Sequence, residues 1–131
     1  MRMLAIDYGL KRMGLAVSNE GLVLPFKTLK VKDHTQAVSD IATICQEERI
    51  DKIVLGLPLR LNGKPSKMAH RVKKFGKTLA GFTGLDVVYS DEQLTTKAAI
   101  RLLRGEKLAV KGRMRDQLAA TLILKDYLGS F

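Results

Sequence analysis

The chain is poor in the residues on which several classes of protein depend. Its single cysteine, Cys45, rules out an intrachain disulfide, and its place among apolar residues indicates a small buried hydrophobe. There is no tryptophan, and only four phenylalanines and three tyrosines are present, which argues against a platform that stacks nucleic-acid bases. Neither His34 nor His70 belongs to a group of residues spaced as metal ligands, and the sequence suggests no Ser-His-Asp or Cys-His catalytic set. Disulfide-stabilised folds, histidine metal sites and nucleophilic triads are therefore not expected.

Long apolar runs are also missing. No stretch approaches the roughly 20 apolar residues of a membrane span, and the first residues contain no apolar run of the length found in signal peptides. We find no internal repeat, low-complexity segment or linker, and 131 residues is the size of one ordinary domain. We therefore expect a single globular domain over residues 1–131, located in the cytoplasm and without a membrane partner.

Acidic residues are scarce and unevenly distributed. The formal net charge is +10, with a sequence pI of about 10.0. Residues 52–85 contain eight lysines or arginines and no acid, and residues 97–115 contain seven with one acid. These segments carry +8 and +6, which leaves −4 for the rest of the chain. This separation favours binding to nucleic acid, and a basic surface that only serves solubility is the alternative.

The apolar pattern predicts a mixed α/β fold. Short apolar or alternating runs predict strands over residues 3–6, 14–18 and 22–31, close enough together for an antiparallel meander. A helix over residues 35–49, a buried strand over 52–56, a helix from a Ser66 cap to about residue 81 and a strand over 86–90 follow. Two last helices are expected over about 95–103 and 113–128. The order βββαβαβαα implies a mixed five-stranded sheet with helices on both faces.

Three isolated carboxylates are the strongest candidates for chemistry. Asp7 and Glu92 each end a predicted strand, and Asp116 opens a helix on a side that continues as Ala120 and Ile123. Buried carboxylates cost desolvation energy unless a cation meets them. Oxygen ligands suit Mg²⁺ or Mn²⁺, and two such ions about 3.5–4 Å apart activate water and stabilise a leaving oxygen. Taken singly, each acid has a simpler interpretation, as a turn residue, a solvated loop acid or a partner of the helix dipole.

Basic residues near these acids are candidates for contact with phosphate. Lys11 and Arg12 follow Asp7 in the run Asp-Tyr-Gly-Leu-Lys-Arg-Met-Gly, where Gly9 permits a tight turn and close approach of a phosphate. A second group lies in the first basic segment: Arg60, Lys64, Lys67, Arg71 and Lys74. We expect both groups to contact a nucleic-acid backbone, and a solvated helix face is the alternative for the second.

Four motifs, in order along the chain, resemble the RuvX (YqgF) family. They are Asp7-Tyr-Gly-x-Lys-Arg-x-Gly, Gly56-Leu-Pro-Leu with a following Asn-Gly, Asp91-Glu92-x-Leu-Thr-Thr, and Asp116-x-x-Ala-Ala-x-x-Ile-Leu-x-x-Tyr-Leu. The resemblance spans about residues 2–128. Members are described as Holliday junction resolvases and as nucleases that process the 5′ end of pre-16S rRNA. It implies an RNase H-like fold and metal-dependent hydrolysis of phosphodiesters, with Asp7 bridging the metals and Glu92 and Asp116 completing the site.

The chain departs from the family pattern at one position. The family usually has arginine after Asp-Glu, whereas this chain has Gln93. If that arginine orients an acid or contacts phosphate, a neighbour such as Arg115 has to replace it. Asp91 is either an outer member of the site or a turn residue.

Several functions stay open from the sequence. The main hypothesis is a nuclease acting on structured nucleic acid, most simply precursor 16S rRNA, as a monomer or weak homodimer. A Holliday junction resolvase is the first alternative, and it is expected to work as a dimer. A non-catalytic RNA-binding assembly factor explains the charge but not the three carboxylates. Sugar-kinase and actin-like ATPases share a similar phosphate loop, yet they need two such domains.

Overall fold

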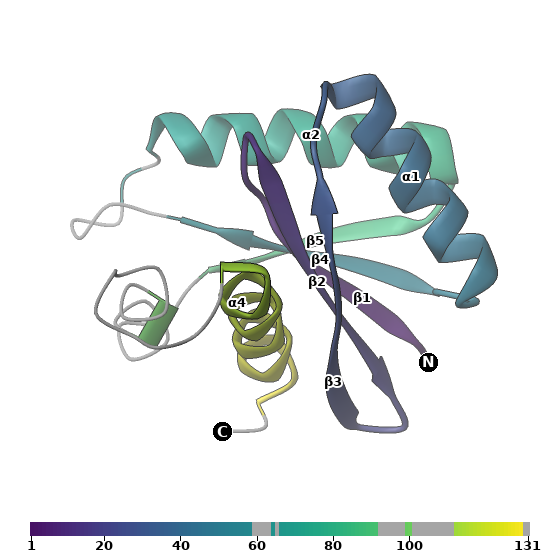
Figure 1. Cartoon of the computed structure of the whole chain (residues 1–131). Coiled ribbons are helices and arrows are strands. Elements are labelled where there is room, and N and C mark those ends of the chain that lie inside the picture. The colour runs from purple at the N-terminus through teal and green to yellow at the C-terminus, as the bar shows by residue number, and fades with distance from the viewer. Residues whose placement is uncertain (59–63, 65, 92–98, 101–111, 130–131) are drawn as a thin grey trace.

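The computed structural model describes residues 1–58, 64, 66–91, 99–100 and 112–129. These residues form a five-stranded sheet of order β3-β2-β1-β4-β5, covered by helices on both faces (Figure 1). The elements are β1 (Met3–Asp7), β2 (Arg12–Asn19), β3 (Leu22–Lys30), α1 (His34–Glu47), β4 (Lys52–Leu57), α2 (Lys67–Thr83), β5 (Asp86–Asp91) and α4 (Gly112–Leu128). Of the helix predicted over about 95–103, only residues 99–100 are described, and they are helical.

The strand pairing confirms the predicted mixed sheet. β1, β2 and β3 form an antiparallel meander, whereas β4 pairs in parallel with both β1 and β5. Helices α1 and α2 pack on one face and α4 packs on the other (Figure 1). β1 lies in the middle, and its carboxyl end points to the same edge as those of its parallel neighbours. This edge is where proteins with parallel strands commonly bind ligands.

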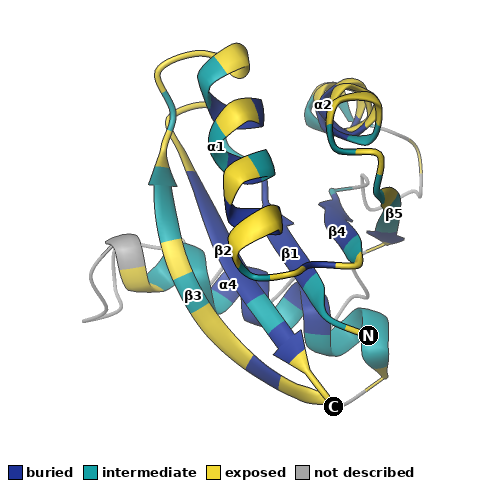
Figure 2. Cartoon of the chain, turned by 90° about the vertical axis from the view of Figure 1, so that its right-hand side faces the viewer, coloured by how far each residue is buried: buried dark blue, intermediate teal, exposed yellow. Residues whose placement is uncertain are grey.

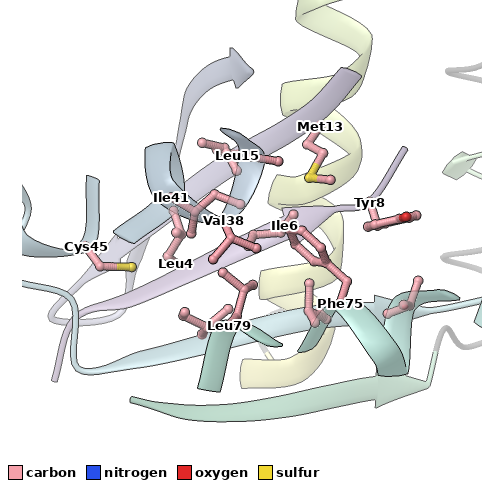
Figure 3. Close-up of a cluster of buried hydrophobic side chains, with 14 of the residues drawn as sticks. Leu4, Ile6, Tyr8, Met13, Leu15, Val38, Ile41, Cys45, Phe75 and Leu79 are labelled. Carbon is pink, nitrogen blue, oxygen red and sulfur yellow. The ribbon is translucent and has the colours of Figure 1, made fainter. Parts of the chain in front are cut away.

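Two apolar cores hold the layers together. Leu4 and Ile6 of β1 point into the larger core with Phe75 and Leu79 of α2, as Figure 3 shows. Ala5 points the opposite way, into a second core with residues of α4. This alternation follows from strand geometry, because successive strand residues face opposite sides of the sheet. The central strands are buried, and exposed residues follow β3 and the outer sides of α1 and α2 (Figure 2).

Most predicted boundaries shift by one or two residues, and two of these shifts have an identifiable cause. β2 begins at Arg12 rather than Gly14, because Arg12 and Met13 already pair with the end of β3. α1 ends at Glu47 rather than Arg49, because the N–H of Ile50 returns to the Cys45 carbonyl while Arg49 takes a positive φ of 52°. The first correction matters for function, because it makes Arg12 a strand residue.

Two further local predictions, the Ser66 cap and the burial of Cys45, are confirmed. The Ser66 hydroxyl accepts the N–H of Ala69 and caps α2, and it also donates to the Pro58 carbonyl at 2.7 Å. The cap therefore ties the start of α2 to the chain leaving β4. Cys45 is buried, as expected of a small apolar residue. Among the described helices, none has the length and apolar character needed to cross a membrane.

Candidate functional site

A cleft of about 440 Å³ opens at the carboxyl ends of β1 and β4. Its walls come from the end of β1, the turn into β2, the chain after β4, the first turns of α2 and the start of α4. The lining residues are Asp7, Tyr8, Gly9, Arg12, Gly56, Pro58, Met68, Val72 and Asp116. Two of the three predicted carboxylates therefore meet in one cleft, although more than a hundred residues separate them in the sequence.

Asp7 is held by the sheet. It is the last residue of β1, and only 7% of it is exposed. It lies on the same side of β1 as Ala5, toward α4, because strand residues alternate. Across the β1–β2 ladder its register partner is Gly14. A nearly buried acid in this position needs positive charge nearby to remain ionised at low cost.

Gly14 brings Asp116 to Asp7. A Cβ atom on Gly14 would overlap the carbonyl group of Asp116 and lie 2.9 Å from the Asp116 Cα. The backbone of α4 therefore rests directly on β2 at the residue that pairs with Asp7. The sequence analysis placed Gly14 in a motif but gave it no role, because the contact involves a helix a hundred residues away. The place of Gly14 in the same motif as Asp7 was the only signal in the sequence.

Asp116 carries the clearest electrostatic feature of the cleft. Its Oδ2 lies 2.9 Å from Nε of Arg12, and the two side chains are 16% and 49% exposed, respectively. The same Oδ2 atom is buried, and among the described residues it accepts no hydrogen bond. The short N···O distance thus reflects an ion pair whose N–H is not aimed at the oxygen. Asp116 is the fifth residue of α4, beyond its first turn, which weakens the helix-dipole interpretation.

The other predicted acids do not complete a cluster among the described residues. Glu92 and Gln93 lie outside the described residues, as does Arg60. Within the described residues, no three histidine, cysteine or acidic side chains converge as a metal site would require. Asp91 is exposed at the end of β5, opposite Leu57. The role of Glu92 as the third acid therefore stays a prediction.

An aromatic group that the sequence analysis missed forms one wall of the cleft. Tyr8 is buried, its hydroxyl lies 2.7 Å from Nε2 of His34, and its ring packs 5.2 Å from that of Phe75 (Figure 3). Burial raises the pKa of Tyr8, and the positive charge of Arg71 acts in the opposite direction. Tyr8 follows Asp7 directly, so strand alternation turns its side chain to the opposite side of the sheet from Asp7. This alternation was the signal in the sequence that Tyr8 faces the larger core.

A basic surface borders the cleft. Helix α2 contains no acidic residue, and Met68 and Val72 from its first turns line the cleft. Its outer side exposes Lys67, His70, Arg71, Lys73, Lys74 and Lys77 (Figure 2). Lys11 and Lys64 are also exposed, whereas Arg115 is half-buried at the start of α4. Positive charge beside a cleft with two acids suits a polyanion that reaches across both.

Known proteins with similar sequences cover almost the whole chain. A model of the RuvX family, described as Holliday junction resolvase, matches residues 1–130. A candidate pre-16S rRNA nuclease of Rickettsia canadensis is 35% identical over an alignment of 133 positions, which covers 98% of this chain and 86% of that protein. A second, from Pseudomonas paraeruginosa, is 37% identical over an alignment of 130 positions, which covers 96% of this chain and 90% of that protein.

Solved structures show the same fold at low sequence identity. Thermus thermophilus RuvC in complex with a Holliday junction superposes with a TM-score of 0.61 at 16% identity, covering 99% of this chain and 98% of that one. The fowlpox virus Holliday junction resolvase superposes with a TM-score of 0.62 at 14% identity, covering all of both chains. The predicted RNase H-like fold is confirmed by these neighbours. Given this fold and the family match over residues 1–130, the chain belongs to the RuvX family.

Proposed function

We propose that this protein is a metal-dependent nuclease that hydrolyses phosphodiester bonds in structured nucleic acid, with the 5′ end of pre-16S rRNA as its substrate. The observation that carries the proposal is the meeting of Asp7 and Asp116 in one cleft beside the basic face of α2. A purely structural role would not require two acids from separate elements, β1 and α4, to meet beside a surface that attracts polyanions. The pre-16S rRNA is suggested by the names of the relatives in Rickettsia and Pseudomonas.

The described residues fit a divalent metal ion. The Asp116 Oδ2 is buried without a hydrogen bond among the described residues, and such an oxygen has lone pairs to offer an ion. Asp7 supplies a second buried carboxylate in the same cleft. Carboxylate oxygens are the ligands preferred by Mg²⁺ and Mn²⁺, so Asp7, Asp116 and Glu92 would hold one or two of these ions. When bound, such ions activate water and stabilise the leaving oxygen of a phosphodiester.

The protein's own residues would hold the substrate in place. Arg71 and Lys74 stand on the exposed side of α2, one turn apart, and can each contact a phosphate of one strand. Lys11 offers a further contact from the turn between β1 and β2. With few aromatic residues in the chain, we infer recognition through backbone phosphate and shape.

The test compares the wild-type protein with Asp7→Asn and with Asp86→Asn, which makes the same change at an exposed acid at the opposite end of the sheet. Each is incubated with Mg²⁺ or Mn²⁺ and a labelled pre-16S rRNA 5′ fragment. We expect cleavage by the wild type and Asp86→Asn, and a loss of at least about 100-fold in Asp7→Asn. RNA bound but uncut by all three proteins would instead support the non-catalytic assembly factor.

Holliday junction resolution is the second candidate. It is favoured by the family description and by full-length superposition on two resolvases. The same three proteins are therefore also given a four-way DNA junction. Symmetric cutting of the junction by a dimer, without cleavage of the RNA, would select this function over rRNA processing.

A further inference from the structure

We propose that Arg12 is the resident cation of the metal site: it neutralises Asp116 when no ion is bound and has to leave that carboxylate before a divalent ion binds there. The inference rests on the proposed metal-dependent function, because it assigns Asp116 to the ion. It differs from the sequence-based hypothesis, in which Arg12 only contacts phosphate. The ion pair of 2.9 Å between Nε and the buried Oδ2 is the observation behind it.

The guanidinium and a metal ion compete for this carboxylate. Mg²⁺ binds carboxylate oxygens at about 2.0–2.1 Å, in a nearly octahedral shell of oxygen atoms. A guanidinium nitrogen 2.9 Å from the same oxygen places a positive charge beside that shell, and this charge would repel the ion. The poor alignment of the Arg12 N–H with Oδ2 also indicates that this contact is held by charge more than by hydrogen bonding.

Only the side chain of Arg12 has to move. Its backbone is fixed at the start of β2 by pairing with Lys30, and the Arg12 carbonyl packs tightly under Gly9. The side chain is half-exposed and lines the cleft, so rotation about its own bonds carries the guanidinium toward solvent at the cleft mouth. At the cleft mouth the guanidinium would lie beside a bound nucleic-acid strand. A planar guanidinium binds phosphate with two parallel hydrogen bonds, which lysine cannot match.

The exchange of Arg12 for a metal ion at Asp116 couples binding of the ion to binding of the substrate. An ion binds more tightly to the molecules in which Asp116 is free of Arg12, so the apparent Kd rises as the paired fraction grows. A phosphate that binds Arg12 removes this competition, and by reciprocity the ion strengthens phosphate binding. Arg12 thus acts as a positioning residue that links loading of the ions to arrival of the substrate.

The test measures Mn²⁺ affinity, by electron paramagnetic resonance of free Mn²⁺, in the wild type, Arg12→Met and Lys11→Met. Methionine keeps an unbranched apolar stem of similar shape and offers no oxygen ligand. Lys11→Met removes the same charge from the adjacent exposed position. If the pair forms in about 70–90% of molecules, Arg12→Met should bind Mn²⁺ about three- to tenfold more tightly than the wild type. Lys11→Met should stay within about twofold.

A second measurement needs only the wild-type fold. The Nε–H signal of Arg12 in a nitrogen–proton correlation spectrum, assigned through Arg12→Lys, should move toward the position of a solvated arginine when Mg²⁺ is added. An unmoved signal, or equal or weaker Mn²⁺ binding by Arg12→Met, would refute the exchange while leaving the metal site intact. Absence of Mn²⁺ binding by the wild type and by Arg12→Met would instead refute the proposed metal-dependent function, and the exchange with it.

Discussion

Replacing Gly14 with alanine tests whether the contact between β2 and α4 builds the site. The added Cβ would overlap the carbonyl group of Asp116 and lie 2.9 Å from its Cα, where carbon atoms normally keep about 3.5–4.0 Å. Every atom in the way belongs to the backbone of a helix, so no flexible side chain can turn aside. Relief requires the start of α4 to move away from the sheet by roughly an ångström or more.

The expected cost follows from this geometry. Overpacking of a close-packed interior costs typically 1–3 kcal/mol, and a clash with helix backbone belongs at the upper end, about 3 kcal/mol. For a domain of this size, 1 kcal/mol corresponds to about 3–4 °C in Tm, so Gly14→Ala should melt about 10 °C below the wild type. Because the same shift draws Asp116 away from Asp7, Mn²⁺ binding should weaken in parallel.

Thermal unfolding followed by circular dichroism measures the first effect, and Gly81→Ala is the matched control. Gly81 lies in α2, is exposed, and has nothing within 4 Å of an added Cβ. Alanine there should raise stability by about 0.5–1 kcal/mol, since glycine is a poor helix former. A Gly14→Ala protein that melts within about 2 °C of the wild type would show that α4 is not held against β2 as described.

Two further predictions concern α2 and the buried thiol. Arg71→Gln and Lys74→Gln should each weaken RNA binding about uniformly across sequences. Each should also lower by about 1 the steepness with which the logarithm of the binding constant falls with the logarithm of the salt concentration. Filter-binding titrations measure both effects, with Lys27→Gln on the edge strand β3 as the control. A slope unchanged by the α2 variants would exclude that face from the interface. Burial raises the pKa of Cys45 from 9.0 to about 11, so alkylation of the folded protein by iodoacetamide should stay slow until the pH approaches 11. Stability should fall between pH 9 and 11, because the unfolded thiol loses its proton first; rapid alkylation at pH 8 would contradict this.

The fold was largely predictable because its signals are local. The apolar run over residues 3–6 located β1 within a residue, and the Ser66 cap did the same for the start of α2. The start of β2 was predicted wrongly because it depends on a residue outside the pattern itself. Arg12 carries no apolar signal, and it becomes a strand residue only because Lys30 lies opposite it in β3.

The site was predictable in part. Asp7 and Asp116 could be singled out because each is a lone acid at the end of an apolar element, and the fold brings both to one cleft. The sequence could not indicate that Arg12 pairs with Asp116, because a sequence does not show which way a charged side chain points. A basic residue beside a candidate acid is equally compatible with phosphate contact and with an internal ion pair. Which of these two roles Arg12 takes depends on the strand register and on the close approach of α4 at Gly14.

If the proposed function is correct, these contacts also explain how a site for cations persists while no ion is bound. Two acids brought together near the end of β1 would repel each other and lose hydration, which costs stability in any metal-free state. Arg12 reduces that cost from within the same chain, and its half-exposed position keeps the arrangement reversible. An apolar residue at position 12 would leave Asp116 without this counter-charge, whereas a fully buried arginine would hold it permanently. The site therefore needs a cation at this position that is close enough to stabilise the acid and exposed enough to leave it.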